Sequence, residues 1–266
     1  MEWPSEPSNS AHSLSSLAGP SSHARRSPER VLSLVCNSAH ASVIRRRKSF
    51  IRVYDTTTLA RACVCDLNSS SPYFFNAGLL ASGPVLDTLC SAYAATIAHA
   101  LQSSPGLPEF DVLFGPAYKG IPFAAGTALL LHRDHQIDVG FAYDRKEAKD
   151  HGEGGITVGT PIKGKRVLVL DDVATAGTAI RGAIDTVKRE GGEVIGAVLM
   201  LDRQEVGKEG RSMIAEVEEL LGGKGRVPTI LKMRDLMAWL QAHGRTEELE
   251  KMQEYWEQYG AKDASA

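Results

Sequence analysis

Two adjacent carboxylates end an apolar run in the segment VLVLDDVATAGTAIRGA, residues 167–183. Carboxylates are costly to place against a buried strand, so Asp171 and Asp172 predict a ligand that uses them. The small residues that follow, up to Ala179, can bring backbone N–H groups together on an anion at the start of the next helix. Because that anion would repel the carboxylates, we expect Asp171 and Asp172 to face ribose hydroxyls or a hydrated Mg²⁺. The segment therefore predicts a phosphosugar site.

Three other interpretations fit this segment less well. A Walker B strand needs a G-x-x-x-x-G-K-[ST] loop elsewhere, and the sequence has none. A dinucleotide-binding loop needs G-x-G-x-x-G after a strand, which is also absent. Capping of the following helix explains one aspartate but not two.

Two further segments have the composition of ligand-binding loops. GPAYKGIPFAAG (115–126) predicts a strand, a tight turn and a helix, with Lys119 in the turn, where its ammonium could hold a second anionic group. YDRKEAKDHGEGG (143–155) has many charges and three glycines, so we expect a mobile loop. Such a loop is either a solvated surface or a lid over a polyanionic substrate.

Apolar strands alternate with amphipathic helices from about residue 71. This order predicts a mostly parallel sheet covered by helices on both faces, with ligands bound beyond the carboxyl ends of the strands. The expected strands are 111–114, 138–144, 165–172, 194–202 and 227–233, and the expected helices are 84–102, 121–132, 178–192, 211–222 and two between 234 and about 259. The helix 84–102 places its large apolar residues on one face: Val85, Leu86, Leu89, Tyr93, Ile97 and Leu101.

The composition excludes several classes of protein. With 266 residues and 43% hydrophobic content the chain can bury a substantial core, and a net charge of −2 argues against nucleic acid or membrane binding. Four cysteines form no disulfide framework, and the pair Cys63 and Cys65 alone is a weak metal site. No run of residues is apolar over the length of a membrane span. We therefore expect a cytoplasmic protein.

The motifs together resemble one family. VLVLDDVATAGTA resembles the phosphoribosyl diphosphate (PRPP) motif of type I phosphoribosyltransferases. SPYFFNAG, FGPAYKGIP, RKEAKDHGEGG and LDRQE, in this order, resemble orotate phosphoribosyltransferases of the stand-alone fungal and bacterial kind. The resemblance covers about residues 71–260. It implies the type I phosphoribosyltransferase fold with a small pyrimidine-binding hood, and Mg²⁺-dependent transfer of phosphoribosyl from PRPP to N1 of orotate, giving orotidine 5′-monophosphate for UMP synthesis.

The resemblance also assigns roles to individual residues. Orotate would contact Phe74, Phe75, Thr175 and Arg203. PRPP would contact Tyr118, Lys119, Arg145, Lys146, Lys149, His151, Asp171, Asp172, Val173, Ala174, Thr175, Ala176, Gly177, Thr178 and Ala179. The residues closest to the chemistry would be Arg145, Lys149, His151, Asp171 and Asp172, with Lys149 stabilising the departing pyrophosphate. Mg²⁺ would be held through PRPP and water near Asp171 and Asp172, without direct protein ligands. A homodimer is implied, with the lid closing over the neighbouring subunit's site.

Residues 1–70 depart from the family pattern. The family has Lys-Ser-Gly-Arg before SPYFFN, whereas this chain has DLNSSS (66–71), so the substrate-contacting lysine has no counterpart. Serine-rich and without helical or strand periodicity, residues 1–70 predict a disordered or non-native extension preceding a transferase domain at 71–266. An error in the gene model, a diverged extension and a targeting peptide remain alternatives for it.

Two other functions stay open from the sequence. One is a catalytically impaired PRPP-binding regulatory protein of the same fold, although the full lid motif favours an enzyme. The other is a purine phosphoribosyltransferase, against which SPYFFN and LDRQE argue. No orotidylate decarboxylase domain is expected after the transferase.

Overall fold

The computed structural model describes residues 82–149, 155–174, 177–207 and 210–262. Six helices occur in this part of the chain: α3 (Gly83–Leu101), α4 (Gly120–His135), α5 (Thr178–Arg189), α6 (Met213–Leu220), α7 (Met233–Ala242) and α8 (Thr246–Tyr259). The strands are β1 (Val112–Gly115), β2 (Gly140–Lys149), β3 (Gly155–Gly159), β4 (Arg166–Ala174), β5 (Glu193–Asp202) and β6 (Thr229–Lys232). No helix in these described ranges combines the length and apolar character needed to cross a membrane.

The six strands form one sheet in the order β3-β2-β1-β4-β5-β6. All neighbouring pairs are parallel except β2 and β3, which are antiparallel. The chain adds β2 and β3 on one side of β1, and then adds β5 and β6 on the far side of β4. Since β1 and β4 are neighbours, the sheet has its topological switch point between them, where open α/β sheets bind their ligands.

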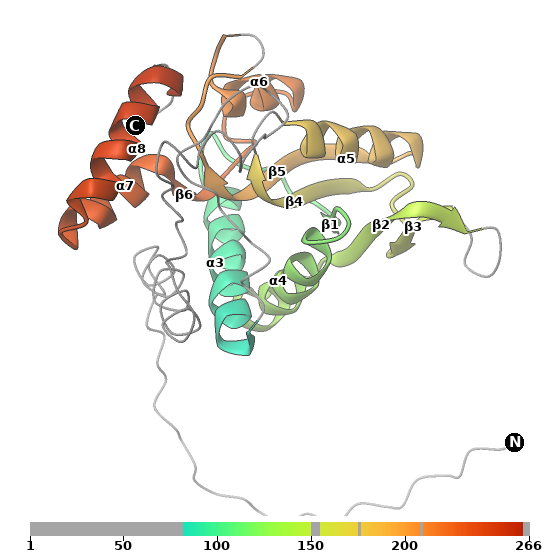
Figure 1. Cartoon of the computed structure of the whole chain (residues 1–266). Coiled ribbons are helices and arrows are strands. Elements are labelled where there is room, and N and C mark those ends of the chain that lie inside the picture. Colours follow the sequence, from blue (N-terminus) through green and yellow to red (C-terminus); the bar gives the residue numbers. More distant parts are fainter. Residues whose placement is uncertain (1–81, 150–154, 175–176, 208–209, 263–266) are drawn as a thin grey trace, which may run out of the picture.

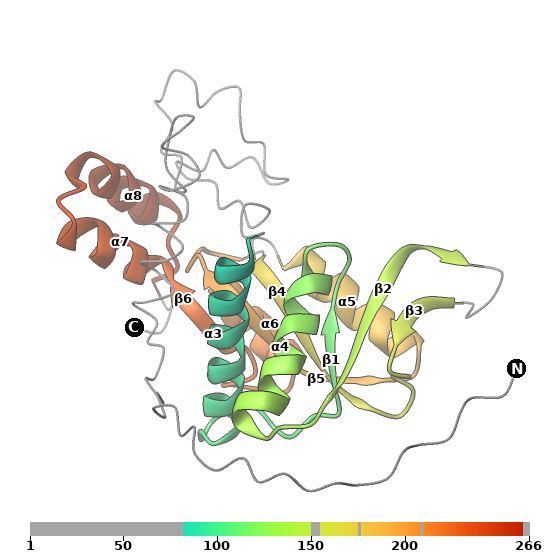
Figure 2. The ribbon, with the colours of Figure 1, turned by 90° about the horizontal axis from the view of Figure 1, so that it is seen from below.

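Helices cover both faces of the sheet, as Figures 1 and 2 show. Side chains of α3, α4, α7 and α8 join one buried apolar cluster, and side chains of α5 and α6 join a second cluster. The central strands β1 and β4 contribute to both clusters, which explains why their sequences are continuously apolar rather than alternating. This arrangement confirms the predicted fold class.

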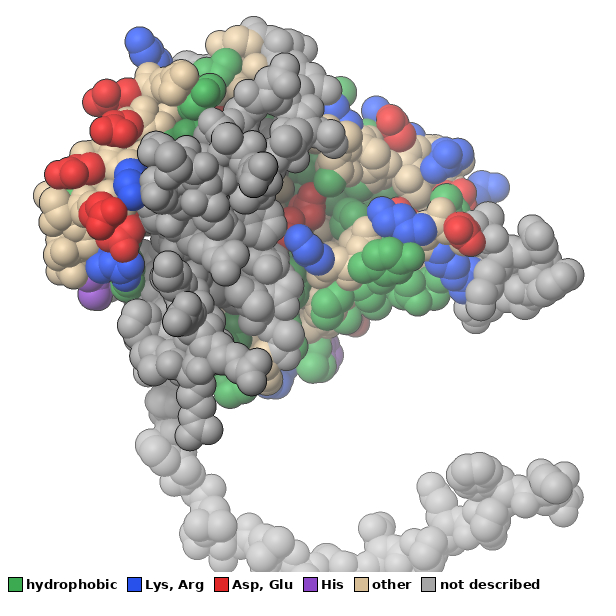
Figure 3. Space-filling view, viewed as in Figure 1, with side chains coloured by type: hydrophobic (Ala, Val, Ile, Leu, Met, Phe, Trp, Pro, Cys, Tyr) green, Lys and Arg blue, Asp and Glu red, His purple; other side chains and the backbone are tan. Residues whose placement is uncertain are grey.

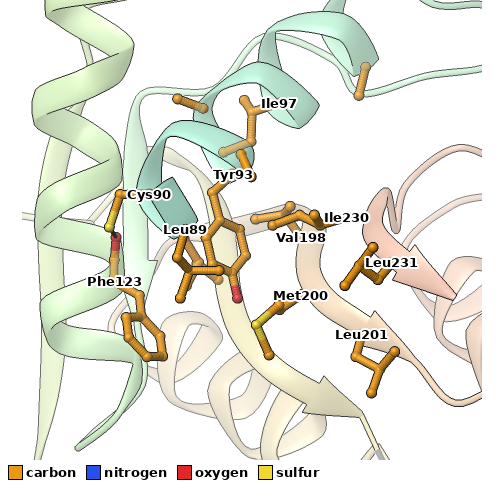
Figure 4. Close-up of a cluster of buried hydrophobic side chains, with 14 of the residues drawn as sticks. Leu89, Cys90, Tyr93, Ile97, Phe123, Val198, Met200, Leu201, Ile230 and Leu231 are labelled. Carbon is orange, nitrogen blue, oxygen red and sulfur yellow. Dashed lines mark hydrogen bonds between the residues drawn. The ribbon is translucent and has the colours of Figure 1, made fainter. Parts of the chain in front are cut away.

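Helix α3 lies against the sheet along the face that its periodicity predicts. Val85, Leu89, Tyr93 and Ile97 are all buried. Figure 4 shows the ring of Tyr93 among Leu89, Ile97 and side chains of β5 such as Val198 and Met200. At roughly 25 cal/mol per Å² of apolar surface, this row contributes several kcal/mol to folding. It also fixes α3 beside the carboxyl end of β4.

The charged segment after Tyr143 differs from the sequence prediction. The expectation of an irregular loop was wrong for residues 145–149, because they extend β2 and the strand returns as β3. Asp144 lies opposite Thr157 and Lys149 lies opposite Gly155, with a register irregularity between the two pairs. The hairpin escaped prediction because β3 is short and half-exposed, so it lacks the apolar signature of the central strands. Residues 150–154 lie outside the described part.

Candidate active site

The structure brings the first two predicted segments together at the switch point. The turn 116–119 follows β1, and Asp171 and Asp172 lie near the carboxyl end of β4, the strand beside it. The ammonium Nζ of Lys119 lies 3.3 Å from Oδ2 of Asp172, forming an ion pair. Half of the Lys119 side chain is exposed, so its charge is also accessible to a ligand. The ion pair places a cation and a carboxylate at the switch point, directly beside Asp171.

The turn between β1 and α4 is tightly packed. A Cβ on Gly115 would lie 2.3 Å from the carbonyl oxygen of Gly120, and a Cβ on Gly120 would collide with Gly115 in the same way. Glycine at both positions therefore lets the start of α4 close onto the end of β1. Between them the Ala117–Tyr118 peptide is cis, and the Tyr118 side chain is 69% exposed. The turn presents Tyr118 and Lys119 to the solvent side of the site.

Asp171 is buried, and its environment is unusual for a carboxylate. Its Oδ1 accepts a hydrogen bond from the Asp172 amide at 2.9 Å, whereas its buried Oδ2 has no hydrogen-bond partner among the described residues. Burial, followed by the nearby charge of Asp172, raises the pKa of Asp171 to about 7. An unsatisfied buried acceptor is unfavourable until a donor meets it. The site therefore has an acceptor suited to a hydroxyl donor or a cation.

Tyr93 supports the strand that carries this carboxylate. Its hydroxyl donates a 2.9 Å hydrogen bond to the backbone carbonyl of Asp171, inside the apolar cluster under the site. Burial raises the Tyr93 pKa well above its ordinary value, with Asp172 and Asp171 adding to the shift, so the phenol stays protonated and remains a donor. The sequence predicted Tyr93 only as a core residue.

The start of α5 has the features of an anion site. Gly177 precedes the helix with φ of 68°, a left-handed conformation that favours glycine. The first turn of α5 contains no acidic residue, and Thr178 and Ala179 are exposed there. The amides at a helix start attract anions, so this end suits a phosphate group. Val173 is half-buried and Ala174 ends β4, leading the chain to this point.

The β2–β3 hairpin carries the cations of the predicted lid. Nζ of Lys146 lies 5.9 Å from the ring centroid of Tyr118, and Nη1 of Arg145 donates to the Gly155 carbonyl at 3.4 Å. Lys and Arg side chains gather over this hairpin in Figure 3, with acidic side chains among them. Lys149 is the last residue of β2, and the structure describes its backbone only. The lid thus starts beside the turn that carries Lys119.

Asp144 was not selected from the sequence, yet it connects the turn to the lid. Its Oδ1 accepts a 2.6 Å hydrogen bond from the amide of Ala117, across 27 residues of sequence. It immediately precedes Arg145, where the charged half of β2 begins. The sequence did contain a signal for Asp144, because this acidic residue follows the apolar residues of a strand, as Asp171 and Asp172 do.

Arg203 is buried rather than solvent-facing. It follows β5, and its Nη2 lies 2.6 Å from Oε1 of Glu205. The guanidinium that the resemblance assigns to orotate is therefore already held by an ion pair within the protein. Five predicted site residues lie outside the described residues, so their positions stay predictions: Phe74, Phe75, His151, Thr175 and Ala176.

The side chains at this site can be compared with the ligands that Mg²⁺ prefers. No group of three or more potential metal ligands occurs among the described residues. Two carboxylates do converge, and the unpartnered Oδ2 of Asp171 is the kind of oxygen that Mg²⁺ prefers. Because Mg²⁺ usually keeps several waters and binds substrate phosphates, two carboxylates fit an ion held together with a phosphorylated ligand.

The comparisons with known proteins identify the chain as a phosphoribosyltransferase. The family model described as "Phosphoribosyl transferase domain" matches residues 92–221. An orotate phosphoribosyltransferase of Acinetobacter baumannii is 47% identical over 190 residues, covering 71% of this chain and 84% of the relative. That of Aeromonas salmonicida is 48% identical over 195 residues, covering 71% and 86%. The crystal structure of the Francisella tularensis orotate phosphoribosyltransferase superposes with a TM-score of 0.60 at 34% identity, covering 72% of this chain and 88% of that one.

These relatives narrow the class to a particular family. The chain belongs to the orotate phosphoribosyltransferases, within the type I phosphoribosyltransferases.

Proposed function

We propose how the described residues carry out the orotate phosphoribosyltransferase reaction, the activity of this enzyme in pyrimidine biosynthesis. The observation that carries the proposal is the group of Lys119, Asp171 and Asp172 at the switch point of the sheet. The 5′-phosphate of PRPP binds at the start of α5, and the ribose hydroxyls donate to the aspartates. The pyrophosphate then reaches the turn with Tyr118 and Lys119.

In this proposal the protein accelerates the reaction mainly by positioning the substrates and by stabilising the charges that develop. As the bond between C1′ of the ribose and the pyrophosphate oxygen breaks, C1′ gains positive charge. N1 of orotate then forms the new bond from the opposite face, and the N1 proton is released. Lys119, Arg145 and Lys146 compensate the charge that develops on the leaving group, and Lys149 is assigned the largest share. Closure of the lid excludes water, which would otherwise compete for the cationic carbon. No covalent intermediate with the enzyme is required.

The two aspartates also fit the cofactor. Asp171 and Asp172 would hold Mg²⁺ through water and through PRPP, and the bound ion supplies positive charge that neutralises the pyrophosphate. Asp171 remains the acceptor for a ribose hydroxyl, since its Oδ2 has no partner among the described residues. Lys119 keeps Asp172 in place before the substrate arrives.

Consumption of orotate tests this function. The full 266-residue chain, with PRPP and Mg²⁺, should reduce the ultraviolet absorbance of orotate, while adenine and hypoxanthine give no turnover. The base specificity is expected from the similarity to orotate phosphoribosyltransferases. Equal turnover of a purine base would contradict the assignment of the substrate. Failure to bind PRPP in a titration would contradict the roles of Asp171 and Asp172.

Asp144 should control the position of the pyrophosphate turn. We expect Asp144→Ala to raise the KM for PRPP about tenfold, because loss of the acceptor for the Ala117 amide releases the turn. Asp144→Asn keeps an oxygen acceptor and should retain most of the affinity. Steady-state kinetics with PRPP varied and orotate saturating gives both values. Equal effects of Ala and Asn would mean that charge, rather than the hydrogen bond, is what Asp144 contributes.

A homodimer with a shared lid completes the proposal. In Figures 1 and 2 the β2–β3 hairpin projects beyond the body of its own sheet, a direction that supports action on a neighbouring subunit. A closed two-fold dimer would give both subunits a complete site.

A further inference from the structure

Three side chains form a buried polar group beyond the end of β5. Nη2 of Arg203 lies 2.6 Å from Oε1 of Glu205 and donates to the Tyr255 hydroxyl at 3.2 Å. The Tyr255 hydroxyl in turn donates to the same Oε1 of Glu205 at 2.9 Å. The Arg203 and Glu205 side chains are only 8% and 15% exposed, and Tyr255 is buried. Each of the three side chains is therefore bonded to the other two.

The backbone around this group is tied to the end of the chain. The Val206 amide donates to the Tyr259 carbonyl at 3.1 Å, and the Ala261 amide donates to the Gln204 carbonyl at 2.7 Å. An antiparallel bridge joins Glu205 to Gly260 between these two bonds. The loop that carries Arg203 is thus fixed by the residues that end α8, which lies about 50 positions later in the sequence.

Because the group is buried, the stability of the folded chain depends strongly on its geometry. A buried guanidinium needs an opposite charge and satisfied donors, and removing one partner of a buried pair is costly. Because the guanidinium is planar with donors in a fixed fork, bonds on Nη2 also fix the plane of the remaining N–H groups. Burial raises the pKa of Glu205, and the charge of Arg203 and the hydrogen bonds from Tyr255 and Arg203 counteract this shift.

We infer that Tyr255 and Glu205 are positioning residues that orient the Arg203 guanidinium toward the pyrimidine, so that helix α8 determines the affinity for orotate. The inference rests on the proposed role of Arg203 in binding orotate. Neither residue touches the substrate in this scheme, and both act through Arg203. Helix α8 thereby gains a function beyond completing the apolar cluster.

Removal of one hydroxyl tests the inference. Tyr255→Phe should raise the KM for orotate about 5- to 20-fold, with the KM for PRPP unchanged; this is less than for a lost direct bond to a charged group, because Tyr255 acts through Arg203. Tyr259→Phe is the matched control, because it deletes a hydroxyl one turn later in α8 from a ring that packs on Tyr255. A lower melting temperature of Tyr255→Phe without a change in the KM for orotate would show a structural role only and overturn the inference.

A double-mutant cycle shows whether Tyr255 acts through Arg203. Arg203→Lys keeps the positive charge but loses the planar, forked donors of the guanidinium. In that background, Tyr255→Phe should raise the KM for orotate little further. Independent, multiplicative effects would overturn the inference. Failure of the wild-type chain to consume orotate would contradict the proposed function itself. An unchanged KM for orotate in Arg203→Lys would contradict the role of Arg203 instead. The experiments thus distinguish failure of the inference, failure of the role of Arg203 and failure of the proposed function.

Discussion

Asp171→Asn should make the protein more stable at pH 8 while lowering its activity about 10- to 150-fold. Loss of activity follows because a charged acceptor for a ribose hydroxyl contributes about 1.5–3 kcal/mol. The gain in stability follows from burial, which raises the pKa of Asp171 from its ordinary value of 3.8 to about 7 in the folded protein. Deprotonating this buried group costs folding free energy, and asparagine avoids that cost. Its Oδ1 can still accept from the Asp172 amide.

The sign of the pH dependence follows from this shift. A carboxyl with a raised folded pKa binds its proton more tightly in the folded chain, so its contribution to stability is complete below about pH 4 and is lost as the pH rises through about 7. Thermal unfolding should therefore show a melting-temperature difference between Asp171→Asn and wild type that grows from pH 5 to pH 8 by roughly 5–10 °C. Asp185→Asn, an exposed carboxyl on α5, should show no such growth.

Ligand binding gives a second measurement of the same carboxyl. If Asp171 must be charged to accept a ribose hydroxyl and to fit Mg²⁺, binding of PRPP with Mg²⁺ at pH 6 should release protons, and affinity should rise toward pH 8. Calorimetry in two buffers of different ionisation enthalpy measures the protons released, and Asp171→Asn should release fewer. A difference in melting temperature that stays flat between pH 5 and 8 would contradict the raised pKa.

The sequence predicted the layers of the fold because the relevant signals are local. Apolar runs gave β1, β4 and β5, and the row Val85, Leu89, Tyr93 and Ile97 gave the buried face of α3. Asp171 and Asp172 could be selected as candidates from the sequence because helix capping explains only one of two carboxylates at the end of a buried strand. Lys119 belongs to a different segment from these two aspartates. One rule nevertheless places all three together, because ligands bind at the carboxyl ends of parallel strands.

The contacts that escaped prediction connect residues distant in sequence. Tyr93 and Asp171 are separated by 78 positions, Ala117 and Asp144 by 27, and Tyr255 and Glu205 by 50. No periodicity within one element encodes such pairs, since they depend on how the elements pack. A tyrosine on the apolar face of a helix is read as core, and only the packed structure shows where its hydroxyl points. Positioning residues are therefore the least predictable part of this site.

Lys149→Ala should lower kcat about 100- to 1,000-fold with a smaller change in the KM for orotate. Loss of one positive donor to the departing pyrophosphate affects the transition state more than the bound substrates, and such donors contribute about 2.7–4 kcal/mol. Lys188→Ala, on the exposed surface of α5, is the control for charge alone. Single-turnover kinetics would separate the chemical step from product release. A fall in substrate affinity with kcat unchanged would assign Lys149 to binding instead.

Hybrid dimers decide which subunit Lys149 serves. If the lid closes over the neighbouring site, a dimer of one Lys149→Ala subunit and one Asp171→Asn subunit has one site with both defects and one site with neither. Such hybrids, co-expressed with two different tags and purified over both, should recover about half of the wild-type activity. If the lid serves its own subunit, each site carries one defect and activity stays at the level of the parent variants. The far end of the β2–β3 hairpin extends beyond the other strands of the sheet, so we expect recovery.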